Sequence, residues 1–157
     1  MPPISGIENS WMKIAYKEKG QKELKGNNHN PVIIKYHAST TLNAKSDETP
    51  WCSSFVNWVM QQAKIQGTNS AAAASWLTWG ERCSAKSGAI TVIHNAKATN
   101  SNLTRSGNHV GFLVKETAMH YELLGGNQSD MVRVTLYPKS SWSLRDYRWP
   151  KIAEEAI

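Results

Sequence analysis

The sequence predicts an α+β fold in which helices precede an antiparallel sheet. Apolar residues recur at helical spacing in the first half of the chain, whereas the second half contains short β-branched and aromatic runs separated by Gly, Asn, Ser and Pro. Helices followed by successive strands are typical of α+β proteins and not of alternating parallel folds. The 157 residues fit a single domain, 1–157, with its core at about residues 10–150.

The predicted helices begin at capping residues or at a proline in the first turn, and three of them end near a glycine. The strongest starts at Thr49-Pro50 and keeps apolar helical spacing up to Gly67. Asn30-Pro31 opens a weaker helix that ends at Tyr36. The four helices are expected over residues 11–18, 31–36, 50–67 and 71–79.

The second half of the chain predicts five strands, each bounded by turn-forming residues. One of them opens with HVGFLV, and the next ends in the polar stretch GGNQ. Their expected ranges are 89–93, 110–114, 121–124, 131–137 and 144–149.

Composition and charge indicate a folded protein with an anionic partner. The chain is 40% hydrophobic and 19% charged, and its net charge is +6 with a pI near 9.4. The basic residues form no block, which argues against nucleic acid. The longest uncharged run, 67–80, is too polar and too short to span a bilayer, so no membrane insertion is expected. The N-terminus lacks the pattern of a secretory signal peptide, which predicts synthesis in the cytoplasm.

Cys52 is the candidate nucleophile. It lies in the first turn of the strongest predicted helix, where backbone N–H groups favour the thiolate and can lower a thiol pKa to roughly 3.5–7.5 when a basic group helps. Cysteine is also among the most buried residue types, so packing alone is the competing interpretation. Cys83 has no adjacent base signal and is expected to be structural, and a disulfide between the two is not required.

A cysteine nucleophile needs a base and a group that orients that base. Of the five histidines, His109 is preferred because it opens a glycine-containing strand after the turn SGN, whereas the others are expected to be exposed or lightly packed. Asn127 at the end of the next strand could accept a hydrogen bond from the imidazole, and Gln128 is the alternative. Neither spacing nor a fourth ligand supports a zinc site, so no metal or cofactor is expected.

The order DETPWCSSFVNWVMQQA, SWLTWG, GAITVI, NHVGFLV, LLGGNQSD and YRWP resembles the papain-fold peptidoglycan amidohydrolases of the NlpC-like and CHAP group. The resemblance covers the chain from about Trp11 to Pro150. It implies a papain-like fold with Cys52 as nucleophile, His109 as general base and acid, and Asn127 as the polar third member. Asn108 stands where glycine usually precedes the histidine.

The resemblance implies thiol attack on an amide of the cell-wall peptide, which makes peptidoglycan the expected substrate. The Cys52 backbone N–H and a donor from the preceding loop would hold the oxyanion. Trp51 could line the substrate cleft, while Asp47 and Glu48 could shape the loop, bind a cationic group or simply be solvated. Two other interpretations are a transglutaminase-like acyl transferase and a wall-binding module without catalysis.

Small members of this group serve as type VI secretion effectors and as phage lysins. A compact catalytic domain suits injection, so the favoured role is an antibacterial toxin that acts in the periplasm or cell wall of a target bacterium. That role implies a cognate immunity protein in the producing cell. A phage or prophage endolysin with the same chemistry is the alternative.

Overall fold

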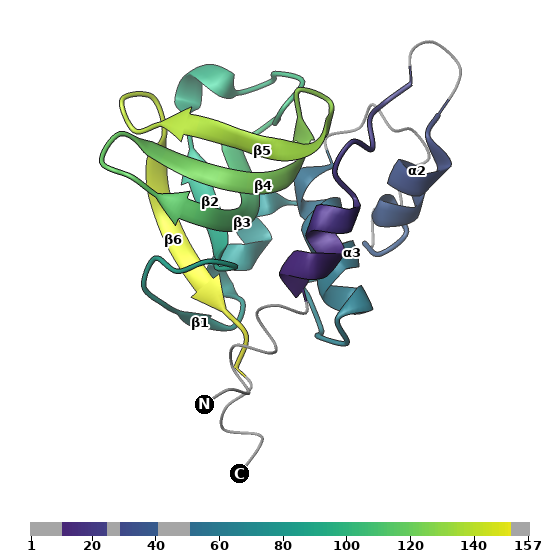
Figure 1. The fold of residues 1–157 in the computed structure, drawn as a ribbon. Helices are drawn as coiled ribbons and strands as arrows, with labels where there is room; N and C mark the ends of the chain where they lie inside the picture. The colour runs from purple at the N-terminus through teal and green to yellow at the C-terminus, as the bar shows by residue number, and fades with distance from the viewer. Residues whose placement is uncertain (1–10, 25–28, 41–50, 152–157) are drawn as a thin grey trace.

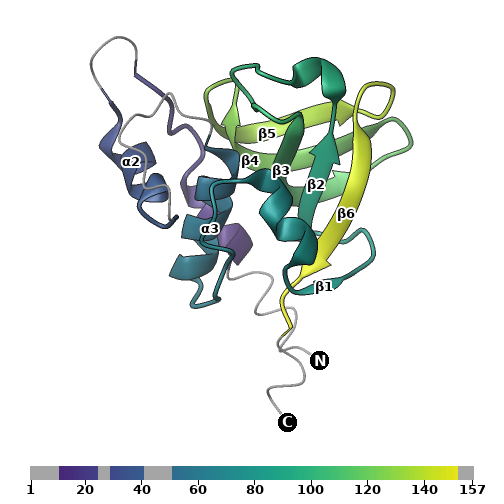
Figure 2. The same cartoon turned by 180° about the vertical axis from the view of Figure 1, so that it is seen from behind.

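The computed structural model describes residues 11–24, 29–40 and 51–151 and forms two layers (Figure 1). Six antiparallel strands form a curled sheet in the order β1-β6-β2-β3-β4-β5. The helices gather on one side of this sheet, and the view from behind shows β2, β3 and β6 running side by side (Figure 2). The predicted α+β class with an antiparallel sheet is confirmed.

The helices that begin at Trp11 and Pro31 start where the sequence predicts, whereas Thr49 and Pro50, at the expected start of the main helix, lie outside the described residues. A helix spans residues 11–17, and α2 spans Pro31–His37 with the Asn30 side chain accepting a hydrogen bond from the Val32 N–H. The main helix, α3, spans Cys52–Gln62 and therefore stops well before Gly67. Lys64 ends it by adopting a left-handed backbone with φ 65°. The segment predicted as a fourth α-helix is a 3₁₀ helix, η1, over Ala73–Thr78.

All five predicted strands are present, and several are longer than expected. The short strand β1 was not predicted, because its two residues are exposed and carry no alternating pattern. A short 3₁₀ helix, η2, over Ala96–Ala98 lies between β2 and β3. The strands are β1 (Glu81–Arg82), β2 (Ile90–His94), β3 (Asn108–Glu116), β4 (His120–Gln128), β5 (Met131–Pro138) and β6 (Ser143–Trp149).

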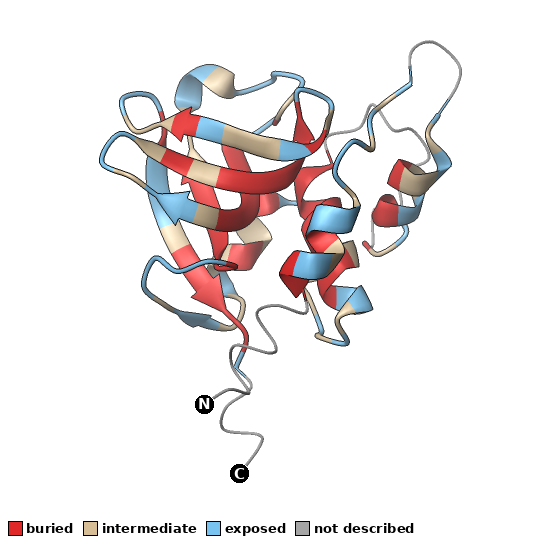
Figure 3. Cartoon of the chain, in the orientation of Figure 1, coloured by how far each residue is buried: buried red, intermediate tan, exposed pale blue. Residues whose placement is uncertain are grey.

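The core fills the space between α3 and the sheet (Figure 3). Phe55 of α3 meets Phe112 of β3 edge to face, with ring centroids 6.3 Å apart. Gly126 of β4 lets the two elements approach, because a Cβ built there would lie only 2.7 Å from carbon atoms of Phe55 and Trp51. This contact fixes the N-terminus of α3 against the end of β4.

Among the described residues, none of the helices has the length and apolar character needed to cross a membrane.

Candidate active site

Cys52 is the first residue of α3 and is 5% exposed. Its thiol faces the backbone N–H groups of Val110, of Ser53 and of Cys52 itself, which favour the thiolate. Burial outweighs them and raises the thiol pKa to about 11. The direction is the opposite of the lowered pKa expected for a cysteine at a helix start, because the thiol is enclosed by protein.

His109 lies on β3, directly before Val110, so the Cys52 thiol lies beside the backbone of the residue next to the predicted base. The imidazole is fully buried, and its Nε2 is 2.9 Å from Oε1 of Gln128. Burial lowers the pKa of His109 to about 4, and the hydrogen bond to Gln128 opposes this shift only in part. At neutral pH the imidazole and the thiol are therefore both uncharged.

Gln128 determines the tautomer of His109. Its Nε2 donates to the carbonyl oxygens of Leu123 at 3.1 Å and of Arg133 at 2.6 Å, so the side-chain oxygen must be the atom that faces the imidazole. An amide oxygen only accepts, which assigns the ring proton to Nε2 of His109 and leaves Nδ1 as the basic nitrogen. Within the described part of the chain, this buried Nδ1 has no hydrogen-bond partner.

Asn127 does not supply the oxygen that faces His109, because its buried Oδ1 has no hydrogen-bond partner among the described residues, and this corrects its assignment as the orienting residue. Its Nδ2 donates to the carbonyl oxygens of Asn102 at 2.9 Å and Leu103 at 3.0 Å, so it anchors the loop between β2 and β3. The strand turns at this point, where Asn127 has φ 61°, and it directs adjacent side chains to different partners. The alternative, Gln128, takes the orienting position.

Tyr137 and Trp142 belong to the site but were not identified from the sequence. The Tyr137 Oη is 3.2 Å from Nε2 of His109, and the two ring centroids are 5.2 Å apart. Trp142 meets both rings edge to face, at 5.2 Å from Tyr137 and 6.3 Å from His109. Tyr137 lies on an ordinary alternating strand, so only the pairing of β4 with β5 reveals its position.

Trp51 is fully buried, which is incompatible with the expected place in a cleft wall. Its ring stacks on Tyr36 at a centroid distance of 5.8 Å, and its Nε1 donates to Glu23 at 2.8 Å. Trp51 therefore supports the start of α3 from inside the protein. Asp47 and Glu48 lie outside the described residues.

The remaining candidate residues contribute no second reactive cluster. His37 is fully buried and its Nδ1 lies 2.9 Å from the Ser54 hydroxyl oxygen, so the expectation that it is exposed or lightly packed is wrong. Cys52 and Cys83 are both free thiols, and Cys83 is half-buried. Across the described ranges, no three His, Cys, Asp or Glu side chains gather in a way that could hold a metal ion.

The arrangement has the parts required for nucleophilic acyl transfer. It combines a thiol at a helix N-terminus, an imidazole with a fixed tautomer and a backbone N–H at the first helical residue. Comparisons of the chain with protein-family models, with curated proteins and with solved structures gave no match.

Proposed function

We propose that this chain is a papain-like cysteine amidase or endopeptidase that hydrolyses amide bonds in peptidoglycan peptides. The observation that carries the proposal is the meeting of Cys52, at the start of α3, with β3 beside the oriented imidazole of His109. Sequence order supports the same assignment, because nucleophile, base and orienting amide follow one another as in the NlpC-like and CHAP enzymes.

In the proposed reaction, the Cys52 sulfur attacks the carbonyl carbon while its proton moves to Nδ1 of His109. Because burial disfavours both charges, thiolate and imidazolium form together during the attack and not beforehand. The Cys52 backbone N–H is placed to hold the oxyanion. His109 then protonates the leaving amine, and water hydrolyses the thioester.

The proposed biological role is that of an antibacterial effector delivered into a target bacterium's periplasm or cell wall. A phage endolysin would use the same chemistry. The effector role requires a periplasmic immunity protein that blocks the enzyme in related cells, and co-expression of such a protein should abolish lysis.

Digestion of purified sacculi tests the chemistry. Wild-type protein should release fragments whose mass spectra show one new amino and one new carboxyl terminus, which also identifies the bond. Cys52→Ala should release none, whereas Cys83→Ala, which removes the other thiol, should resemble wild type. Lysis by Cys52→Ala would refute the catalytic assignment, and retention of Cys52→Ala on sacculi without cleavage by wild type would favour the binding module.

A further inference from the structure

The candidate site contains a buried hydroxyl that the proposed reaction has not used. Tyr137 on β5 is 6% exposed, and its Oη is 3.2 Å from Nε2 of His109. The same nitrogen is 2.9 Å from Oε1 of Gln128. Two oxygen atoms, from neighbouring strands, therefore converge on one imidazole nitrogen.

The tautomer defines what the tyrosine hydroxyl does. Because Gln128 can only accept from His109, Nε2 carries the proton, and the Tyr137 oxygen meets that N–H as a second acceptor. The packing of Tyr137 and Trp142 against the imidazole limits rotation of the ring, so Nδ1 is kept away from these acceptors. Ring plane and tautomer are thus set by the same three side chains.

The site needs such acceptors because the reaction places a positive charge in a buried position. Many catalytic histidines lie against a carboxylate that stabilises the imidazolium. Here no charged side chain among the described residues contributes to the pKa shift of His109. The titratable groups around it are Tyr137 on β5 and, across the Val110 amide, Cys52 on α3. From β4, the neutral Gln128 faces it.

We propose that Tyr137 is a positioning residue that acts with Gln128 in place of a carboxylate, holding the Nε2–H of His109 and stabilising the imidazolium as the Cys52 proton arrives. The role rests on the proposed cysteine chemistry. The role requires the tyrosine ring for packing and the hydroxyl as a hydrogen-bond acceptor. Tyr137→Phe separates the two contributions, because it keeps the ring and removes the hydroxyl.

The test compares Tyr137→Phe with Tyr147→Phe, which removes the hydroxyl of another buried tyrosine, one that donates to Glu116 instead of facing His109. Iodoacetamide alkylation of Cys52, followed by mass spectrometry of the Cys52 peptide, needs no substrate. In Tyr137→Phe we expect the alkylation rate at pH 7 to fall about tenfold, which is the scale of one hydrogen bond to a charged group. Tyr147→Phe should react at the wild-type rate. Equal rates in all three proteins would overturn the proposal.

Nuclear magnetic resonance of the His109 ring supplies a second readout, first in the protein with Tyr137 intact and then in Tyr137→Phe. In wild-type protein, the ring ¹⁵N shifts should show protonated Nε2 and unprotonated Nδ1, and a proton on Nδ1 would refute the acceptor role. In a Cys52→Ala background, Tyr137→Phe should move the midpoint of His109 protonation to lower pH. If alkylation and ring titration behave as expected but sacculi are not cleaved, the proposed substrate fails and the role of Tyr137 stands.

Discussion

His109 lies in an environment that excludes water and keeps its imidazole neutral. It is fully buried, has its pKa lowered to about 4, and is neutral at pH 7. A neutral imidazole is the correct form for a general base, so the site is prepared to accept a proton without a preformed ion pair. The same burial should lower the free energy of unfolding at acidic pH, where His109 would be protonated in the unfolded chain.

We predict that the free energy of unfolding falls as pH decreases from about 6.5 to about 4. Over this range the unfolded chain binds a proton at His109 and the folded chain does not, so acid favours unfolding, and the loss levels off below the folded pKa. The full effect is about 3 kcal/mol. Urea titrations across this pH range should show a steeper decline for wild type than for His109→Gln. Parallel curves would contradict the shifted pKa.

A second prediction separates the two adjacent amides. Gln128→Met keeps the side-chain length but cannot accept from His109, so kcat/KM should fall by about 10- to 100-fold, the range of one charge-assisted hydrogen bond. Asn127→Gly tolerates the left-handed backbone at that position and removes only the contacts to the loop at Asn102 and Leu103. It should retain most activity. The reverse ranking of the two variants would restore Asn127 as the orienting residue.

At the scale of elements, the sequence predicted the five longer strands and the start of α2 because these depend on local residue patterns. Asn30 caps α2 as expected, and the alternating runs all became strands. The predicted end of α3 was wrong because Lys64 adopts a left-handed backbone, a conformation that is uncommon for lysine and cannot be predicted from its residue type. The choice between Asn127 and Gln128 depends on how β4 turns at its end, which is a property of pairing with β5 and not of the letters GGNQ.

The close packing of α3 on β4 yields the third prediction. In Gly126→Ala the new Cβ would lie 2.7 Å from carbon atoms of Phe55 and Trp51, so α3 must shift, which should cost about 1–3 kcal/mol of unfolding free energy. In Gly125→Ala the nearest atom is Oε1 of Gln128, the end of a flexible side chain. That variant should unfold near the wild-type denaturant midpoint but lose activity as Gln128 moves from His109. Equal losses of unfolding free energy in the two variants would show that the backbone of β4 shifts in both, and not α3 in Gly126→Ala alone.

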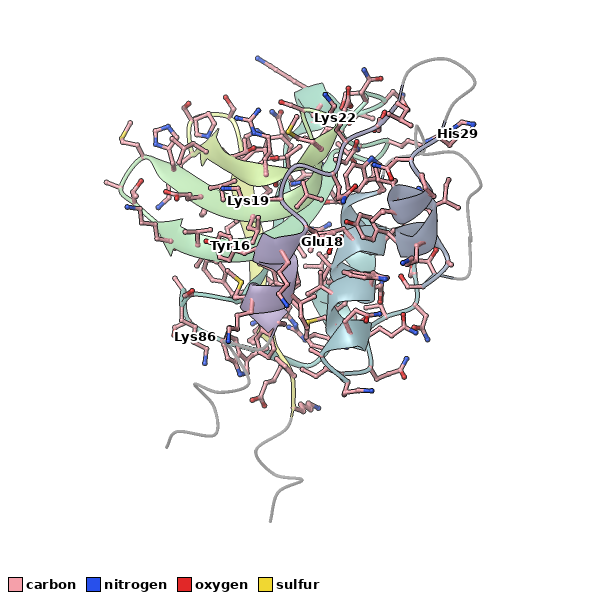
Figure 4. All side chains as sticks on the ribbon, turned by 45° about the vertical axis from the view of Figure 1, so that its right-hand side comes forward. Tyr16, Glu18, Lys19, Lys22, His29 and Lys86 are labelled. Carbon is pink, nitrogen blue, oxygen red and sulfur yellow. The ribbon has the colours of Figure 1, made fainter. Side chains whose placement is uncertain are left out.

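At the scale of the whole molecule, part of the net charge of +6 comes from lysines in and after the first helix. Lys19 and Lys22 are exposed and lie on the segment that follows the first helix (Figure 4). The two acids that flank this pair are half-buried and bonded to core aromatic residues: Glu18 accepts a 2.6 Å hydrogen bond from Tyr36, and Glu23 accepts one from the indole of Trp51. This arrangement leaves the segment that follows the first helix with a positive outer surface, which suits attraction to an anionic wall polymer.

The fourth prediction tests this surface in the inactive Cys52→Ala protein, so that binding is measured without digestion. Replacing Lys17, Lys19 and Lys22 by Gln should weaken retention on sacculi about fivefold at low ionic strength, because three exposed charges at the end of the first helix and in the segment after it are removed together. A matched protein with Lys64, Lys97 and Lys115 replaced by Gln has the same net charge and should lose less. Both differences should vanish near 1 M salt, where the screening length is about 3 Å. Equal losses in the two triple variants would show that total charge, and not this surface, governs the attraction.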